Sequence, residues 1–421
     1  MKYEHLFIFA IDKIYKGGFL MKKKVFIVGA KRSPIGAFLG SLKDVHPREM
    51  GAQVLKQLLD ETKIPVDQIS EVIVGNILPA NLGQGIARQI SLTAGIPETV
   101  PAYSLNMVCG SGMKTIMNAY MGIQSGFSDI VVAGGVESMS GAPFMVDGSI
   151  RSGRKMGNME LIDHMIYDAL TDAFGQMHMG ITAENIAERY QITREEQDAF
   201  AYHSQQKAIK AMDEGKFKDE IVPIVIKTRK GEVVFDTDEY PNRSTNPEIL
   251  GKLRTAFMKE GTVTAGTSSG INDGASFTII ASEDAVKKYN LTVLAEVVGI
   301  GQGGVDPNYM GMGPVPAIRN LLKNSEMALK DVDLLELNEA FASQSLGVIH
   351  ELVEEHQVDK ETLLSKTNVN GGAIALGHPV GVSGNRIVVT LLHEMMKRNA
   401  KTGLASLCIG GGMGTAILIK R

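Results

Sequence analysis

The sequence predicts an α/β fold built from two duplicated α/β units, with layered sheets and helices and a loop domain inserted in the first unit. Three observations lead to this prediction. Short apolar strands alternate with helices at both ends of the chain, similar landmarks recur in both ends, and the middle differs in composition. The 421 residues suffice for two or three domains of ordinary size.

Short apolar segments and amphipathic segments alternate through the first unit. Val25–Gly29 and Val72–Val74 have the pattern of buried strands, and a helix near Pro47 carries apolar residues on one face. Met113–Gln124 is expected to be a helix after a glycine-rich turn, and Ile130–Ala133 a further strand. Such alternation is typical of parallel α/β layers.

Three landmarks of the first unit have counterparts near the C-terminus. An Asn follows an apolar segment, a candidate reactive residue lies in a glycine-rich turn before a helix, and a Gly ends an apolar strand. The separations of the pairs are 262, 269 and 275 residues, a slow drift that favours duplication. The pairs are Asn76 and Asn338, Cys109 and His378, and Gly135 and Gly410.

These patterns divide the chain into units. Residues 21–139 together with 270–292 form the N-terminal unit, and residues 293–421 form the C-terminal unit. Residues 140–269 are rich in Met and polar residues and contain a helix that opens with a capping box at 193–196. We interpret this segment as a loop domain that covers a ligand.

The first twenty residues differ in pattern from the rest of the chain. The apolar stretch Leu6–Ile11 is too short for the core of a signal peptide. Met21 then opens Met-Lys-Lys-Lys-Val-Phe-Ile-Val, which has the pattern of a fresh start leading into the first strand. We therefore expect residues 1–20 to be an N-terminal extension from an upstream reading frame.

The composition argues against several classes of partner. A net charge of -4 gives no general attraction to nucleic acid. No apolar run approaches the roughly 20 residues of a membrane-spanning helix. Cys109 and Cys408, the two cysteines, are too few for a disulfide framework, and no His or Cys cluster has metal-site spacing. We expect a cytoplasmic protein that binds no metal.

The turn Asn106-Met-Val-Cys109-Gly-Ser-Gly112 is the first candidate site. A cysteine between a strand and a helix lies near unpaired backbone N–H groups and the positive end of the helix dipole. Both favour the nucleophilic thiolate. A buried, unreactive cysteine is the alternative on residue type alone. The small flanking residues leave room for a substrate and favour a reactive cysteine.

Three further segments carry polar or reactive groups at the ends of apolar segments. His378 is held between a glycine and a proline before a helix, which suits a residue that takes a proton from a neighbour. Cys408 ends an apolar strand and enters a glycine run that includes Gly410. Asn338 follows the apolar strand Val332–Leu335. Core residues and an ordinary turn are the alternatives for each segment.

One glycine pattern suggests a dinucleotide site but lacks the required context. Gly299–Gly304 matches GxGxxG after a strand, yet Asp306-Pro307 and a second proline at Pro314 follow. No helix can therefore open there to receive a pyrophosphate. We do not expect a nicotinamide cofactor.

The motifs NxVCGSG, NEAFA, GGAIALGHPxGxSG and CIGGG, in this order and at these separations, resemble those of the thiolase family. The similarity runs from about Met21 to Arg421 and is greatest to acetyl-CoA C-acetyltransferases of the biosynthetic type. The resemblance implies a thiolase-like fold and reversible Claisen condensation of two acetyl-CoA to acetoacetyl-CoA and CoA. It also implies a ping-pong mechanism, no cofactor beyond the CoA thioester substrates, and a homo-oligomer, either a dimer or a tetramer.

The resemblance assigns a role to each catalytic candidate. Cys109 would accept the acyl group, and His378 would activate it. Cys408 would move the α-proton of the second acetyl-CoA. Asn338 would hold a water that stabilises the enolate oxygen together with His378. The backbone N–H groups of Cys109 and Gly410 would form the other oxyanion hole.

The resemblance also assigns residues to the CoA and acyl sites. Five align with positions that contact CoA or its pantetheine arm, namely Leu170, His178, Met179, Phe257 and Ser269. Met310 and Phe341 would form walls of the acyl pocket. Relatives place an arginine two residues after Tyr240, but here Asn242 stands there and Arg243 follows. The residue that meets the nucleotide end of CoA therefore stays open.

Other functions are compatible with parts of this pattern. A degradative 3-ketoacyl-CoA thiolase of broader chain length would carry the same motifs, although His-Met-Gly at 178–180 is the pattern of short-chain enzymes. A decarboxylating ketoacyl synthase would be expected to have histidine in place of Cys408. A non-catalytic thiolase-like protein that binds CoA or lipid could lose Cys109, His378 or Cys408, yet all three are present.

Overall fold

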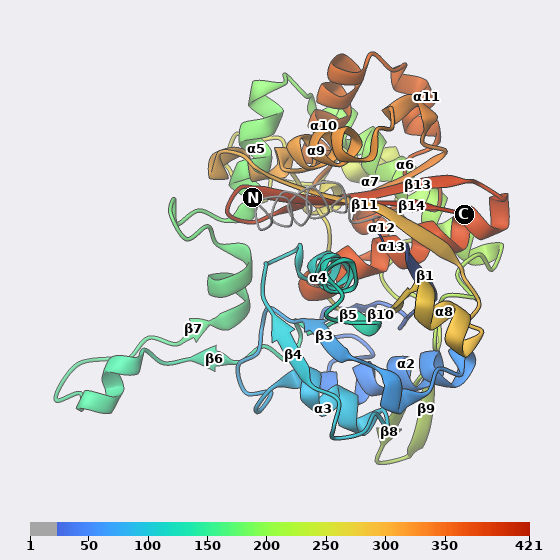
Figure 1. The fold of residues 1–421 in the computed structure, drawn as a ribbon. Coiled ribbons are helices and arrows are strands. Elements are labelled where there is room, and N and C mark those ends of the chain that lie inside the picture. Colours follow the sequence, from blue (N-terminus) through green and yellow to red (C-terminus); the bar gives the residue numbers. More distant parts are fainter. Residues whose placement is uncertain (1–22) are drawn as a thin grey trace, which may run out of the picture.

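A single ten-stranded sheet links the two halves of the chain in the computed structural model, which describes residues 23–421 (Figure 1). The extension expected at residues 1–20 lies outside the described residues. The strands are β1 (Val25–Arg32), β2 (Gly36–Ala37), β3 (Glu71–Gly75), β4 (Ala102–Leu105), β5 (Ile130–Ser138), β10 (Asn272–Ser282), β11 (Ala295–Gly304), β12 (Leu334–Leu337), β13 (Thr402–Ile409) and β14 (Met413–Lys420). Their order is β12-β13-β14-β11-β1-β10-β5-β3-β4, with β2 beside β10.

Each half of the sheet repeats one arrangement of strands. In the first half, β3 runs parallel to β5, and the antiparallel strands β10 and β1 follow across the sheet. In the second half, β12 runs parallel to β13, and the antiparallel strands β14 and β11 follow. The halves join where β1 pairs with β11, Phe26 opposite Glu296 and Ile27 opposite Ala295. The predicted duplication is confirmed, but one of the three landmark pairs is wrong. Gly135 lies opposite Gly75, the residue before Asn76, whereas the residue opposite Leu337, before Asn338, is Ser406 and not Gly410.

The sheet is mixed, whereas the alternation of strands and helices predicts parallel layers. Among the described strands, the parallel pairs of this sheet are β3–β4, β3–β5 and β12–β13. A short glycine turn at 410–412 joins β13 to β14, and such a connection can join only antiparallel neighbours. Strands buried on both faces have the same apolar pattern in either direction, so the sequence could not distinguish the two cases.

Two helices lie between the two halves of the sheet, α4 (Ser111–Ser125) and α13 (Val380–Arg398) (Figure 1). They pack against each other and against strands of both halves. Every residue of α13 from Val380 to Met395 is buried. These helices hold equivalent places in the two units, and they begin two residues after the candidate site residues Cys109 and His378.

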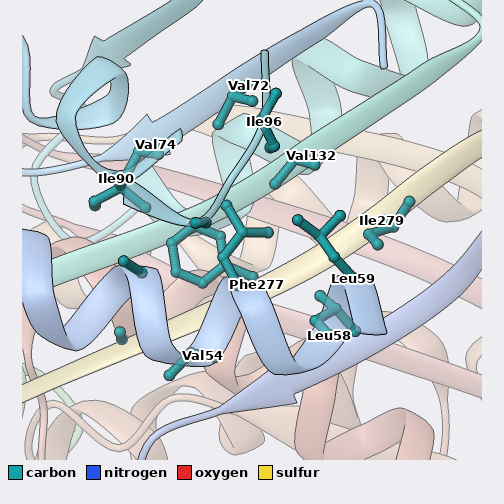
Figure 2. Packing of buried hydrophobic residues seen from close by; sticks show 14 of the residues in the cluster. Val54, Leu58, Leu59, Val72, Val74, Ile90, Ile96, Val132, Phe277 and Ile279 are labelled. Atoms are coloured by element: carbon teal, nitrogen blue, oxygen red, sulfur yellow. The ribbon is translucent and has the colours of Figure 1, made fainter. Parts of the chain in front are cut away.

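Helices also cover the outer faces of the sheet. The first half is covered by α2 (Pro47–Thr62), α3 (Ile86–Thr93) and α8 (Glu283–Tyr289), and Figure 2 shows side chains of α2 packed over those of the strands. The second half is covered by α9 (Pro314–Ser325) and α10 (Ala342–His356), with α11 (Lys360–Ser365) beyond them. The short α12 (Ala373–Leu376) precedes α13.

The chain between β5 and β10 forms a long insertion in the first unit, because these two strands are neighbours in the sheet. It contains β6 (Phe144–Met145), β7 (Ile162–Asp163), α5 (Met179–Arg189), α6 (Arg194–Asp213), β8 (Ile224–Thr228), β9 (Gly231–Phe235) and α7 (Pro247–Gly251). The predicted capping box at 193–196 is present at the start of α6. The segment that carries β6 and β7 projects away from the body of the molecule (Figure 1).

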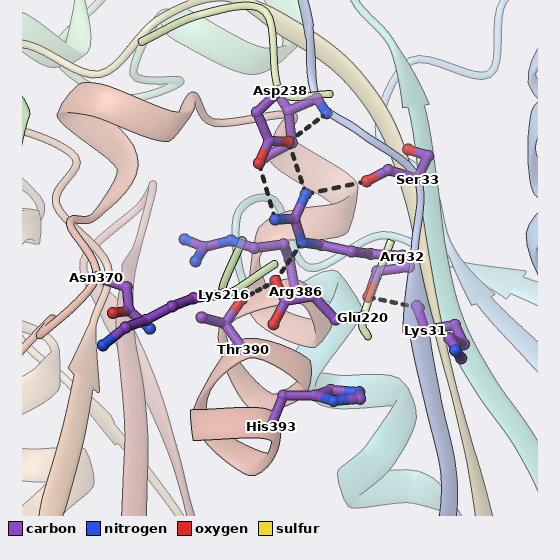
Figure 3. A network of polar contacts seen from close by, with 12 residues as sticks. Lys31, Arg32, Ser33, Lys216, Glu220, Asp238, Asn370, Arg386, Thr390 and His393 are labelled. Atoms are coloured by element: carbon purple, nitrogen blue, oxygen red, sulfur yellow. Dashed lines mark hydrogen bonds and ion pairs between the residues drawn. The ribbon is translucent and has the colours of Figure 1, made fainter. Parts of the chain in front are cut away.

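A buried ionic cluster fixes the insertion to the sheet (Figure 3). The Arg32 guanidinium of β1 is fully buried and donates to both carboxylate oxygens of Asp238, at 2.7 and 2.9 Å. It also donates to Glu220 at 2.6 Å, and Glu220 accepts a hydrogen bond from Thr390 of α13 at 3.0 Å. Asp238 and Glu220 belong to the insertion, so its position is set by β1 and α13 together.

Glycines allow the strands of the first unit to approach the start of α13. A Cβ atom at Gly135 would lie 2.2 Å from the carbonyl oxygen of Gly381, and one at Gly75 would lie 2.8 Å from the same oxygen. Both distances are far below van der Waals contact. The backbone of α13 therefore packs directly on the ends of β3 and β5.

We predict that Gly135→Ala lowers the free energy of unfolding by about 1–3 kcal/mol, because a backbone oxygen of a buried helix would have to move. Thermal unfolding followed by circular dichroism measures the effect. Gly251→Ala is the control, since nothing lies within 4 Å of the added methyl group. Equal melting temperatures for the two variants would contradict the close approach.

Candidate active site

The first turns of α4 and α13 contact each other. A Cβ atom at Gly112 would lie 2.8 Å from the carbonyl oxygen of Val382, and one at Gly384 would lie 2.5 Å from the backbone nitrogen of Met113. The turns that precede the two helices are therefore brought to the same region. These turns carry two of the predicted site residues, one from each unit.

The turn before α4 has a strained conformation. Val108 has φ +45°, a value that β-branched residues rarely adopt. Local hydrogen bonds hold the turn, with the Asn106 Oδ1 accepting from the Val108 N–H at 2.9 Å and the Ser111 Oγ accepting from the Met107 N–H at 2.7 Å. Such strain, held by neighbouring contacts, is typical of functional positions, and here it sets the position of Cys109.

Burial determines the charge of Cys109. It raises the pKa of the thiol to about 11, an effect that the N–H groups of Gly410 and of Cys109 itself only partly offset. The negative charge of Glu137 raises this pKa further. The backbone N–H groups at the turn favour the thiolate, as the sequence predicts, but the effect of burial on the pKa is larger. At neutral pH Cys109 needs a base.

His378 is held in one orientation by hydrogen bonds. Its backbone N–H donates to the Asn272 Oδ1 at 2.9 Å, and its Nδ1 lies 2.5 Å from the Ser383 Oγ. The Ser383 hydroxyl donates to the Pro379 carbonyl at 3.0 Å, so its oxygen accepts the Nδ1–H of His378. This leaves Nε2 as the proton acceptor, and it is buried without a hydrogen-bond partner among residues 23–421.

The His378 imidazole is neutral at physiological pH. Burial lowers its pKa to about 4, and the positive charge of Arg386 acts in the same direction. Arg386 lies on the same helix and is itself buried. A neutral imidazole with a free nitrogen can take a proton from a thiol.

The second unit supplies three more of the predicted residues. Cys408, near the end of β13, is 1% exposed, and its pKa is raised by burial and by the neighbouring Cys109. Asn338 donates its N–H to the Ser406 carbonyl at 3.0 Å, which places it beside the same strand. The Oδ1 and Nδ2 atoms of Asn338 are buried and have no partner in the described part of the chain. Gly410 faces Cys109 through its backbone N–H.

Four of the predicted residues form an apolar group with the second thiol, that of Cys408. Met179, Met310, Phe341 and the partly buried Phe257 belong to one cluster with Cys408. The rings of Phe257 and Phe341 meet edge to face with centroids 6.0 Å apart. These residues come from the insertion and from the second unit, so the cluster depends on the two being packed together.

The remaining predicted contact residues lie at the edges of this group. The His178 ring stacks on Phe257 at 4.8 Å, and its Nδ1 accepts the Gly180 N–H at 3.0 Å, which caps α5. Leu170 packs in a different cluster, where Cys109 also lies. Ser269 donates its N–H to the Ala340 carbonyl, next to Phe341, at 2.9 Å.

The two candidates for the nucleotide end of CoA are engaged in local contacts. The Asn242 Oδ1 accepts from the Ser244 N–H at 3.0 Å and from its hydroxyl at 2.7 Å. Arg243 pairs with Asp213 through both terminal nitrogens, at 3.1 and 2.5 Å. Of these two residues, only Arg243 carries a positive charge that could pair with a phosphate of CoA.

Sequence reasoning missed three residues at the site. Ser383 lies within the GHPxGxSG motif, five residues after His378, and this spacing could have indicated a contact in the first helical turn. Glu137 is the one charged residue in the fully buried strand Ile130–Ser138, which is also a usable signal. Asn272 has no comparable signal, because its contact with His378 spans 106 positions.

A metal site and a membrane-spanning helix are both absent from the part of the chain that the structure describes. Residues 23–421 contain no group of three or more His, Cys, Asp or Glu side chains placed to hold a metal ion. Within the same residues, no helix combines the length and hydropathy needed to cross a membrane.

The chain is similar over nearly its whole length to enzymes that transfer acyl groups. Family models of the thiolase N-terminal and C-terminal domains match residues 25–284 and 291–421. The acetyl-CoA acetyltransferases of Syntrophomonas wolfei subsp. wolfei and Thiocystis violacea are 50% and 51% identical over 402 residues, which cover 95% of this chain and all of theirs. The crystal structure of human mitochondrial 3-ketoacyl-CoA thiolase in complex with CoA matches with a TM-score of 0.89 at 44% identity, covering 95% of this chain and 98% of that one.

The chain therefore belongs to the thiolase family, and it is an acyltransferase. Its mixed α/β architecture is shared with the solved thiolase, as the motifs in the sequence predict.

We predict that Ser383→Ala lowers kcat by about 10- to 100-fold with little change in KM, because His378 loses the acceptor that orients its ring. Ser383→Thr keeps a hydroxyl and should recover much of the loss. Ser125→Ala is the control, since this hydroxyl also donates to a carbonyl of its own helix, that of Gly122. Steady-state thiolysis of acetoacetyl-CoA measures the effect. An unchanged kcat in Ser383→Ala would show that the hydrogen bond does not orient the base.

Proposed function

We propose that this protein is an acetyl-CoA C-acetyltransferase, which condenses two acetyl-CoA to acetoacetyl-CoA and CoA and catalyses the reverse thiolysis. The observation that carries the proposal is the partly buried thiol of Cys109, which neighbours the buried thiol of Cys408 and lies in a turn packed close to the turn that carries His378. The names of the relatives support the substrate, since the proteins from Syntrophomonas wolfei and Thiocystis violacea are both acetyl-CoA acetyltransferases.

In the first half of the reaction, the Cys109 sulfur attacks the thioester carbon of acetyl-CoA. His378 takes the thiol proton on Nε2 and returns it to the departing CoA sulfur as the carbon–sulfur bond to CoA breaks. The backbone N–H groups of Cys109 and Gly410 stabilise the oxyanion of the tetrahedral intermediate. The direction of both N–H groups toward the Cys109 sulfur supports this role.

In the second half, a new carbon–carbon bond forms on the acetyl-cysteine. His378 takes the proton of Cys408 on Nε2, and the resulting Cys408 thiolate removes a proton from the methyl group of the second acetyl-CoA. The enolate carbon attacks the acetyl group on Cys109. The carbon–sulfur bond to Cys109 then breaks, acetoacetyl-CoA is released, and the Cys109 thiolate takes the proton back from His378. A water held by Asn338, together with His378, stabilises the enolate oxygen. Support comes from the buried polar atoms of Asn338 and His378, which have no partners among the described residues.

The walls of the acyl site favour a short chain over the broader range of a degradative thiolase. Met179, Met310, Phe257 and Phe341 belong to one apolar cluster with Cys408, and their bulk would limit the length of an alkyl chain there. CoA would lie along the insertion, at the edge formed by His178, Leu170 and Ser269. The substrates are CoA thioesters, and the proposed reaction needs no further cofactor. The free thiols of Cys109 and Cys408 support a reducing, cytoplasmic location.

Thiolysis of acetoacetyl-CoA, 3-ketohexanoyl-CoA and 3-ketooctanoyl-CoA tests the proposed function. We expect kcat/KM to be at least about 10-fold higher for the four-carbon substrate, because each methylene misplaced in a tight pocket costs about 1–3 kcal/mol. Cys109→Ala should abolish turnover of all three. Equal or faster turnover of the longer substrates would favour a degradative thiolase, and activity in Cys109→Ala would contradict the covalent mechanism.

Cys408→Ala separates the two halves of the same reaction. This variant should still form the acetyl-enzyme, because Cys109 and His378 are intact, but condensation should fall by about 100-fold or more with its general base removed. Intact-protein mass spectrometry after mixing with acetyl-CoA detects the added acetyl group. A non-catalytic CoA-binding protein would show no acetylation in either the wild type or this variant.

We also propose that the protein is a homo-oligomer, either a dimer or a tetramer. β4 lies at the edge of the sheet, where unpaired strands favour pairing with another chain. Exposed apolar side chains lie near this edge and on the projecting segment, and they include Leu92, Tyr103, Met121, Phe127, Phe144, Met156 and Leu161.

Light scattering after size exclusion should give a molar mass of twice or four times the 45.4 kDa chain mass. Tyr103→Lys should lower this molar mass, because it places a charge at the edge strand. A monomer in the wild type would contradict the proposal.

A further inference from the structure

Glu137, in the buried strand β5, accepts four hydrogen bonds although it takes no part in the proposed chemistry. Its side chain is 0% exposed. Its Oε1 accepts from the Asn76 Nδ2 at 2.9 Å and from the Leu78 N–H at 3.1 Å. Its Oε2 accepts from the Ile77 N–H at 3.0 Å and from the Gly381 N–H at 2.9 Å. A buried carboxylate is costly unless it is paired in this way.

The four donors come from two segments that adjoin the candidate active site. Ile77 and Leu78 belong to one apolar cluster with Val380, and Cys109 packs against this cluster. Gly381 lies in the first turn of α13, three residues after His378. Glu137 therefore bonds at once to the segment behind the nucleophile and to the helix start that carries the base.

The four hydrogen bonds are suited to the ionised form of the carboxyl group, because every partner is an N–H donor. The negative charge also lies at the positive end of the α13 dipole, where the helix has no capping bond from its own N-cap side chain. Burial raises the pKa of Glu137 to about 7, and the backbone N–H donors oppose this rise. The neighbouring carboxylate of Asp273 raises it as well, although Asp273 takes its own bond from the Ser140 N–H at 2.9 Å. The ionised form therefore predominates at pH 8.

Space around the carboxylate is fully used. A Cβ atom at Gly381 would lie 2.5 Å from the Glu137 Oε2 and 3.2 Å from the Cα of Asn76. The carboxylate therefore fits one arrangement of the two segments, and a shift of either would break bonds that no water can replace in so close a contact.

We propose that Glu137 is a positioning residue for the acyl-transfer reaction, because its carboxylate fixes the segment behind Cys109 and the first turn of α13 in one relative arrangement. This inference rests on the proposed function and adds to it a residue that touches neither substrate nor the reacting atoms. Glu137 acts through Cys109 and His378, whose separation must be held to a fraction of an ångström for proton transfer.

Two substitutions test the proposal. Glu137→Gln keeps the shape but places an NH2 group where one oxygen accepts two N–H donors. Glu137→Asp keeps the charge but shortens the reach by one methylene. Asp333→Asn is the matched control, because the Asp333 carboxylate also accepts from two backbone N–H groups, those of Lys401 and Thr402, at 2.7 and 3.0 Å. These groups lie at the start of β13, at the opposite end of that strand from Cys408.

The assays combine turnover with a measurement that needs no substrate. Thiolysis of acetoacetyl-CoA gives kcat and KM, and alkylation of Cys109 by iodoacetamide at pH 8, followed by mass spectrometry, reports the reactivity of the thiol. We expect Glu137→Gln to lower kcat by about 100-fold with little change in KM, as a displacement of about 1 Å does in other enzymes. Cys109 in Glu137→Gln should be alkylated as fast as in the wild type or up to about 10-fold faster, because loss of a negative charge beside Cys109 favours the thiolate.

A fall in turnover without a fall in alkylation would distinguish positioning from a general loss of structure. Glu137→Asp should alkylate like the wild type and lose about 10-fold in kcat, and Asp333→Asn should match the wild type in both assays. A kcat within about 2-fold of the wild type in both Glu137 variants overturns the proposal. So does a parallel fall of turnover and alkylation. If the wild type itself lacks thiolysis, the proposed function fails, while the alkylation series still reports whether Glu137 acts on Cys109.

Discussion

The active site depends on the packing of two buried helix N-termini against each other in the centre of the molecule. α4 and α13 approach so closely that glycine is required at Gly112 and Gly384, where a Cβ atom would meet the backbone of the other helix. Buried helix starts have N–H groups that need partners, and they impose a positive potential on whatever lies before them. The sheet halves on either side hold the helices in place, so the geometry of the turns follows from the interior packing of the whole fold.

Burial also determines which protonation states the reaction begins from. The interior raises the pKa of Cys109 to about 11 and lowers that of His378 to about 4, so both groups are neutral at rest. A neutral pair avoids the cost of two isolated buried charges. Charge then develops only when a substrate arrives, and the N–H groups of Cys109 and Gly410 already face the sulfur. The same low-dielectric surroundings that suppress the resting thiolate strengthen these dipoles during reaction.

The sequence predicted much of this arrangement, and the part it missed has a physical explanation. Motifs and repeated landmarks predicted the elements of both units and the turns at Cys109 and His378, because turn chemistry and apolar periodicity are local. Strand direction was not predictable, since strands buried on both faces have the same pattern either way. The burial that raises the pKa of Cys109 was not predictable either, because residues of the insertion and of the second unit contribute to the clusters against which Cys109 packs. Glu137 left a local signal, a charge in an apolar strand, whose meaning appears only with its four partners.

The duplicated units have diverged in a way that explains why one site exists and not two. In the first unit the Asn76 side chain is bonded to Glu137 and to the Val136 carbonyl, so it serves the structure. Its counterpart Asn338 has a buried side chain with no partner among residues 23–421 and is available to a ligand. Gly75 and Leu337 precede this Asn pair and lie opposite Gly135 and Ser406, so Glu137 holds the place in β5 that Cys408 holds in β13. The first unit thus fills this position with a supporting carboxylate, whereas the second places a thiol there. Division of support and chemistry between two copies of one fold accounts for the asymmetry of the site.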